Sequence, residues 1–201
     1  AIEQALSDQD SVAAGIENYE FTQQDLVEAM RRIAERNELI EADVVFLTAD
    51  YDGGLPLIAQ LLPEAGIDPE LVQYVGLSQW DVLPSAFHLP GIQGGWFTMP
   101  SPTRAEQFRD RFQSVYGNAP HPLAAIAYDG VAAVGASVAT GNRDALNSKG
   151  LTLTGGFQGA AGIFRLRNNG TIERGLAVAT IEGNQVVVLD EAPRTFSNFG
   201  F

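Results

Sequence analysis

Short apolar runs of strand length alternate, in the first half of the chain, with stretches in which apolar residues recur at helical spacing. We predict strands at 11–21, 42–48, 72–76 and 94–99. The uninterrupted run ADVVFLT at 42–48 is typical of a parallel strand that is buried on both faces. This alternation predicts an α/β fold, in which a mostly parallel sheet is flanked by helices.

Capping signals locate the starts of the helices more precisely than the apolar spacing does. Thr22 can cap a helix, because Asp25 follows three residues later and an apolar stripe begins at Leu26. Ser101-Pro102 gives the preferred order at a helix start, a cap followed by proline. The first predicted helix begins at Thr22, and three further helices cover about 57–62, 103–116 and 122–140.

The C-terminal third is predicted to form β-hairpins. Residues 163–167 should pair with 172–181 across Asn168-Asn169-Gly170, because Asn-Gly between apolar runs is the strongest short hairpin signal. Residues 186–189 then pair back across a second turn at Gly183-Asn184.

Composition narrows the classes of function. The 201 residues make one ordinary domain or a pair of small lobes, and 45% hydrophobic residues suffice for a core. A net charge of −13 argues against binding to nucleic acid and to anionic lipid. The absence of cysteine excludes disulfides, thiolate nucleophiles and Cys-type zinc sites.

The residues that carry catalysis or bind metals form no known pattern in this sequence. His88 and His121 are the only histidines, and neither has a second histidine at ligand spacing. The glycine-rich loop 155–162 lacks the Gly-Lys-Ser/Thr of a phosphate loop and precedes a strand. The segment 76–80 approaches a nucleophile elbow but ends in Trp80 where glycine is required. We therefore expect no catalytic residue, metal or cofactor.

Two turns that follow predicted strands hold the candidate ligand-binding residues, because ligands of open α/β sheets bind at the carboxyl ends of the strands. Tyr and Trp side chains in such turns offer flat contact surfaces. The alternatives are that the tryptophans fill the core and that the acids cap a helix, or that Asp50 and Asp52 serve a hydrolase. The candidates are Asp50, Tyr51 and Asp52 after the first of these strands, and Ser78, Gln79 and Trp80 after the second.

The order of five segments is specific, although each is weak alone. They are ADVVFLTADYDGG, VQYVGLSQW, GGWFTMP, AYDGVAAVG and GFQGAAGIFRLRNNGTIERGLAVATI. In this order they resemble the second half of the type I periplasmic binding proteins, the relatives of the Leu/Ile/Val-binding proteins. The resemblance covers about 11–196 and is greatest to the penicillin-binding protein activators, lipoproteins of Gram-negative bacteria. Tyr128-Asp129 matches the family's helix-opening Tyr-Asp, in either a structural or a functional role.

The resemblance implies a fold of two α/β lobes, joined by three crossovers, that close on a ligand. Residues 1–201 would form one α/β unit resembling the C-terminal part of such a protein. The second lobe would take about 11–98 and 160–192, and about 101–150 would supply helices of the first lobe. We then expect helices 103–116 and 122–140 to cover their apolar faces on each other, on another chain or on a second copy of this chain.

The resemblance also implies a function, with one alternative. The first is a non-catalytic periplasmic lipoprotein domain, anchored in the outer membrane by lipid upstream of this chain, that regulates a peptidoglycan synthase, a penicillin-binding protein. The alternative is the substrate-binding component of a branched-chain amino-acid ABC importer, with a small, polar, amino-acid-like ligand. Ser78 stands where amino-acid binders carry an acid for the ligand's ammonium. Losing that partner costs about 1.5–3 kcal/mol, which argues against amino-acid capture.

Overall fold

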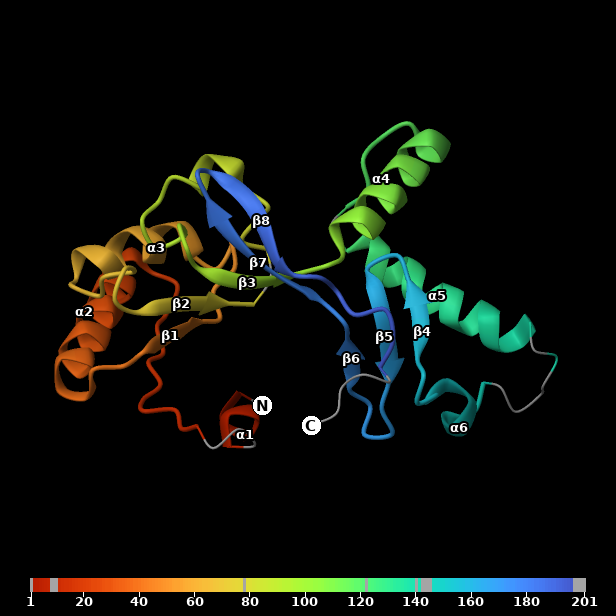
Figure 1. Cartoon of the computed structure of the whole chain (residues 1–201), viewed down its shortest axis with the longest axis horizontal. Coiled ribbons are helices and arrows are strands. Elements are labelled where there is room, and N and C mark those ends of the chain that lie inside the picture. Colours follow the sequence, from red (N-terminus) through yellow and green to blue (C-terminus); the bar gives the residue numbers. More distant parts are fainter. Residues whose placement is uncertain are drawn as a thin grey trace. The chain divides into compact units, whose positions relative to one another are not determined.

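The structure is a computed structural model, and it describes residues 2–7, 11–77, 79–121, 123–139, 141 and 146–196. The chain folds as two compact units (Figure 1). Unit 1 comprises Ala1–Phe97 and Ala179–Val187, and unit 2 comprises Thr98–Val178 and Val188–Phe201. The chain passes between them three times, each time within a strand (β3, β7 or β8).

Unit 1 is built on a five-stranded sheet of order β1-β2-β3-β7-β8. β1 pairs in parallel with β2, from Val44 opposite Gln73 to Leu47 opposite Gly76. The strands are β1 Val44–Leu47, β2 Gln73–Gly76, β3 Trp96–Met99, β7 Ala177–Glu182 and β8 Gln185–Asp190. The helices are α1 Ile2–Ser7, α2 Gln23–Ile40, α3 Leu55–Glu64 and the 3-10 turn η1 Pro84–Ala86.

The core of unit 1 follows from the amphipathic spacing of its helices. Thr22 caps α2 by accepting a hydrogen bond from the Asp25 amide at 3.2 Å, and Leu26 then begins the buried stripe. α3 buries Leu55, Ile58, Ala59 and Leu62, which recur every three or four positions. Burying apolar side chains in this way contributes about 1.5–3 kcal/mol for each large one.

Unit 2 contains a second, antiparallel sheet of order β4-β5-β6. Its strands are β4 Phe157–Gly159, β5 Gly162–Leu166 and β6 Ile172–Arg174, and its helices are α4 Pro102–Tyr116, α5 Ala124–Ala139 and α6 Ser148–Leu151. The β5–β6 hairpin pairs Leu166 with Ile172, across the predicted Asn-Gly turn. α5 packs against β4.

The α/β fold and the helices and strands from α2 to α5 are as predicted, apart from shifts of one or two residues at their ends. The strand predicted at 11–21 is wrong. That segment is irregular, and its large apolar side chains Val12, Ile16 and Phe21 are exposed, so no sheet face holds it. The strand predicted at 172–181 is two strands, because the chain leaves the second sheet at Gly175 and β7 joins the first.

The predicted lobe boundaries also differ from the two units. The resemblance places 160–192 in the same lobe as 11–98, whereas β5 and β6 lie in unit 2 and only residues 179–187 return to unit 1. The reason is pairing: β5 hydrogen-bonds to β4 and β6, and β4 packs on α5. The apolar faces of α4 and α5 meet through the rings of Phe108 and Tyr128, while Val115 and Val131 remain exposed.

Candidate functional site

The parallel pairing of β1 with β2 brings the turns that follow them to the same edge of the sheet. Leu47, the last residue of β1, lies opposite Gly76, the last residue of β2. The segments beginning at Thr48 and Leu77 therefore leave the sheet side by side, as expected for a ligand edge of an α/β sheet.

Asp50 shapes the turn after β1. Its Oδ1 accepts a hydrogen bond from the Gly53 amide at 2.6 Å, and its carbonyl oxygen accepts one from the Leu55 amide at 3.0 Å. Tyr19 donates from its hydroxyl to the Gly53 carbonyl at 3.0 Å. Burial, and secondarily the Asp50 charge, raises the pKa of Tyr19, which keeps that hydroxyl protonated as a donor. The Asp50 carboxylate is therefore engaged within its own turn.

A hollow of about 460 Å³ lies between this turn and the start of α2. Tyr51 and Asp52, both predicted site residues, form part of its wall and are exposed. The rest of the lining is mostly apolar and comes from Phe21, Thr22, Gln23, Leu26, Gly54, Pro56 and Leu57. Because the Thr22 hydroxyl caps α2, the polar side chains left for an occupant are those of Gln23, Tyr51 and Asp52.

Sequence reasoning missed the part of this hollow that α2 contributes. The capping pattern located the start of α2, but no periodicity indicates that Phe21 and Leu26 face the 50–54 turn. Their position follows from close packing: a Cβ on Gly54 would lie 3.2 Å from a ring carbon of Phe21 and 3.3 Å from a methyl of Leu26.

The remaining candidates lie in the turn after β2 and differ in their exposure. Ser78 lies outside the described residues. Gln79 is exposed and has a left-handed backbone, with a φ of 71°. Trp80 is 1% exposed and its ring stacks on Phe97 with the centroids 5.9 Å apart. Trp80 therefore packs in the core, one of the two alternatives that the sequence left open.

The structure thus brings two of the predicted residues, Tyr51 and Asp52, to one hollow, and places Gln79 on the neighbouring turn. The residues that the structure describes contain no group of three or more His, Asp or Glu able to hold a metal ion. No helix within the described ranges combines the length and the apolar character needed to cross a membrane.

Within the Tyr128-Asp129 pair, the aspartate has a structural role. Asp129 is 0% exposed, and its carboxylate accepts hydrogen bonds from the Ala160 amide at 2.5 Å and from Arg174 Nη1 at 2.8 Å. The guanidinium of Arg174 also lies over the Phe164 ring, 4.9 Å from its centroid. Buried charges are stable when they are paired in this way.

Comparisons with known proteins agree on the type of fold. The family described as periplasmic binding protein matches residues 1–185. A comparison with curated protein sequences found no match.

Three solved structures illustrate the likeness. An ABC transporter substrate-binding protein from Desulfitobacterium hafniense is 19% identical with a TM-score of 0.63, covering 93% of this chain and 54% of that one. A putative branched-chain amino acid ABC transporter from Rhodospirillum rubrum is 17% identical with a TM-score of 0.68, covering 93% and 55%. The LpoA C-domain from Haemophilus influenzae, a regulator of PBP1A, is 13% identical with a TM-score of 0.52, covering 80% and 49%. The chain thus spans about half the length of these structures, and the likeness establishes the fold.

Proposed function

The chain belongs to the periplasmic binding protein family, and from this premise we propose that it is a non-catalytic regulatory partner of a peptidoglycan synthase, a penicillin-binding protein. It acts in the periplasm, held at the outer membrane by a lipid anchor that lies upstream of Ala1. Its family and its structural neighbours are binding proteins, which fits a role in recognition.

The observation that carries this proposal is the apolar character of the hollow beside the β1 turn. Phe21, Leu26, Tyr51 and Leu57 line it, and its one carboxylate, that of Asp52, is exposed. An exposed ion pair contributes about 0–1 kcal/mol, too little to hold the ammonium of a free amino acid. An apolar side chain from a partner protein would suit these walls, and tyrosine is among the residues that dominate protein interfaces.

The engagement of Asp50 supports the same conclusion. Of the two acids in this turn, Asp50 already accepts the Gly53 amide, and breaking that bond would open the turn. The fold likeness to the LpoA C-domain, a regulator of PBP1A, agrees with the proposal as an analogy at the level of fold.

The alternative is a substrate-binding component of a branched-chain amino-acid importer. One structural neighbour, an ABC transporter substrate-binding protein from Desulfitobacterium hafniense, was solved in complex with Leu. In this chain, Tyr51 and Asp52 would then contact the side chain and the ammonium of a small amino acid.

Calorimetry separates the two functions. The chain is titrated with leucine, isoleucine and valine, and separately with purified penicillin-binding proteins of the source bacterium. We expect saturable heat with one synthase and none with the amino acids. Micromolar binding of an amino acid without binding to any synthase would establish the importer function instead.

A further inference from the structure

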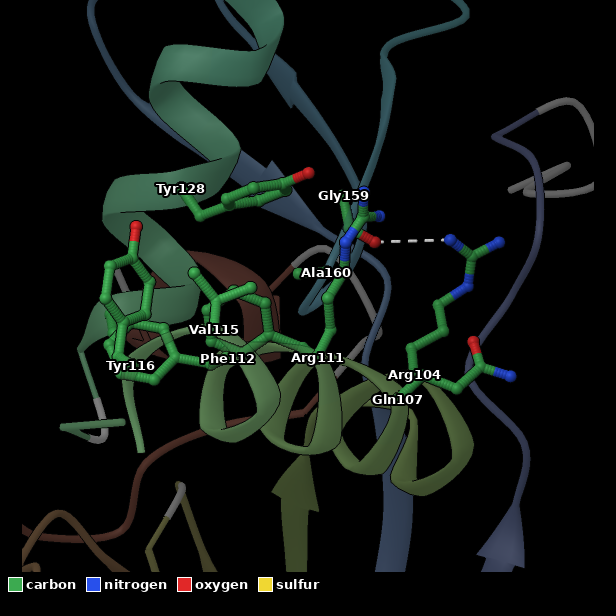
Figure 2. A pocket seen from close by; sticks show the side chains of 11 residues that line it. Arg104, Gln107, Arg111, Phe112, Val115, Tyr116, Tyr128, Gly159 and Ala160 are labelled. Atoms are coloured by element: carbon green, nitrogen blue, oxygen red, sulfur yellow. Dashed lines mark hydrogen bonds between the residues drawn. The ribbon is translucent and has the colours of Figure 1, made fainter. Parts of the chain in front are cut away.

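A second hollow, of about 380 Å³, lies wholly within unit 2, between α4, α5 and the end of β4 (Figure 2). It is separate from the hollow proposed above to contact a synthase, and its volume is within the range of small-molecule sites, about 300–1,000 Å³. Its lining divides into an aromatic wall and a basic end.

The aromatic wall is a continuous set of ring contacts. Phe108, Phe112 and Tyr116 are spaced four residues apart on α4, so they share one face of that helix. The centroids of Phe108 and Phe112 are 6.0 Å apart, and those of Phe112 and Tyr116 are 4.5 Å apart. Tyr128 of α5 completes the wall, 5.4 Å from Phe108.

The basic end comes from Arg104 and Arg111, which are two helical turns apart on α4 and both line the hollow. Arg104 donates one hydrogen bond from Nη1 to the Gly159 carbonyl at 3.2 Å, which holds its guanidinium at the hollow, as Figure 2 shows. Within the described ranges, no carboxylate pairs with either arginine. By contrast, ion pairs engage Arg31, Arg32, Arg36, Arg165, Arg167 and Arg174.

Arg109 and Arg194 also have no ion pair among the described residues, so what distinguishes Arg104 and Arg111 is that both line one hollow, Arg104 half-buried and Arg111 exposed. They leave several N–H donors for a planar anion, and a carboxylate matches the geometry of the guanidinium fork. The lining contains no Asp or Glu, so an ammonium group on the ligand would find no carboxylate there and would lie near two cationic groups.

We propose that the hollow between α4 and α5 binds an organic carboxylate that carries an aromatic or branched aliphatic body and no amino group. Arg104 and Arg111 hold the carboxylate, and the rings of Phe108, Phe112 and Tyr128 contact the body. This ligand class differs from a zwitterionic amino acid, and the site needs no residue of unit 1.

Three probes of nearly equal size test the charge requirements of this recognition by calorimetry: 3-phenylpropionate, its uncharged amide, and phenylalanine, which adds an ammonium group. We expect 3-phenylpropionate to bind at least tenfold tighter than the other two. Equal binding of all three, or binding of none, would overturn the proposal. Overturning it would leave the synthase proposal intact, because that site lies in unit 1.

Variants on one helix locate the binding. Arg104→Gln, which removes a half-buried guanidinium, should weaken 3-phenylpropionate about tenfold, as expected when a charged hydrogen bond is lost. Arg111→Gln removes an exposed guanidinium and should weaken it less, up to about fivefold. Arg109→Gln is the matched control, since Arg109 is an exposed arginine of α4 that does not line the hollow. Circular dichroism checks that each variant folds. An equal loss in the Arg109 variant would overturn the proposal. It would also be overturned if light scattering finds a dimer and calorimetry finds no binding of 3-phenylpropionate to that dimer.

Discussion

The carboxylate of Asp129, on α5, accepts a hydrogen bond from the guanidinium of Arg174, at the end of β6, with 2.8 Å between Oδ2 and Nη1. The same carboxylate accepts the amides of Ala160 and Ala161, which follow β4. One buried side chain therefore fastens a helix to both outer strands of the second sheet. We therefore expect the stability of unit 2 to depend on the Asp129 carboxylate.

Replacing Asp129 with Asn should destabilise the protein strongly. The variant leaves the Arg174 charge, whose side chain is 15% exposed, without a counterion, and breaking a buried pair costs about 3–5 kcal/mol. Urea unfolding followed by circular dichroism measures the loss. Glu35→Gln is the control, because the Arg31–Glu35 pair is exposed and should contribute less than about 1 kcal/mol. Equal effects of the two substitutions would contradict this account of Asp129.

Gly159→Ala should also destabilise unit 2, through the same carboxylate. A Cβ at this position would lie 2.5 Å from the Asp129 carboxylate, so the carboxylate or β4 must shift, at about 1–3 kcal/mol. Gly155→Ala, in the same loop region, meets nothing within 4 Å and should change stability by less than about 0.5 kcal/mol. A neutral Gly159→Ala would show that the packing here is looser than described.

The packing of Trp80 can be tested in unit 1 by fluorescence. A Cβ on Gly76 would lie 2.3 Å from the indole ring, so Gly76→Ala should displace Trp80 from its contact with Phe97. We expect a red-shifted emission and a lower urea midpoint. Trp96 is 46% exposed, and the comparison is made in a Trp96→Phe background so that Trp80 alone reports. Unchanged emission would contradict the buried position.

The pH dependence of stability has an identifiable source at Glu173. Hydrogen bonding from Arg165, at 2.7 Å, lowers the pKa of Glu173, burial opposes this, and Arg167 lowers the pKa further. A carboxyl whose folded-state pKa is lowered stabilises the fold above its ordinary pKa of about 4.3, and this contribution is lost as the pH falls through the lowered value. Glu173→Gln should therefore flatten the acid limb of the stability profile. Part of the pH dependence should remain in this variant, because hydrogen bonds from Arg36 and Arg32 also lower the pKa of Glu17.

The fold was predictable from the sequence where local signals and burial agree. The cap at Thr22 and the apolar run at 42–48 each specify an element by themselves, and the structure has both. The burial expected for the second is wrong, because β1 is an edge strand whose Val44 and Phe46 are exposed. The prediction for 11–21 failed because the large apolar residues there, Val12, Ile16, Tyr19 and Phe21, do not alternate and no neighbouring strand pairs with the segment. Gly175 interrupts the predicted strand at 172–181, since its amide bonds to Ile163 and β7 then continues in another sheet.

The candidate site was predictable only in part, because a turn can be placed without knowing which way its side chains point. The strand pattern located Tyr51 and Asp52 at the ligand edge, and the hollow lies there. It could not distinguish Asp50, which folds back onto Gly53, from Asp52, which faces outward. Nor could it join Arg104 to Tyr128, because contacts between helices depend on tertiary packing that one periodicity does not encode.

The central claim, that the hollow beside the β1 turn contacts a peptidoglycan synthase, is tested most directly by the affinity of matched variants for that synthase. Tyr51→Ser removes an aromatic side chain from the wall, whereas Leu71→Ser removes an apolar side chain that is 82% exposed and lies outside the hollow. We predict that Tyr51→Ser weakens the complex at least tenfold, about 1.4 kcal/mol, and that Leu71→Ser leaves it unchanged. Equal affinity of the wild type and both variants would contradict the claim.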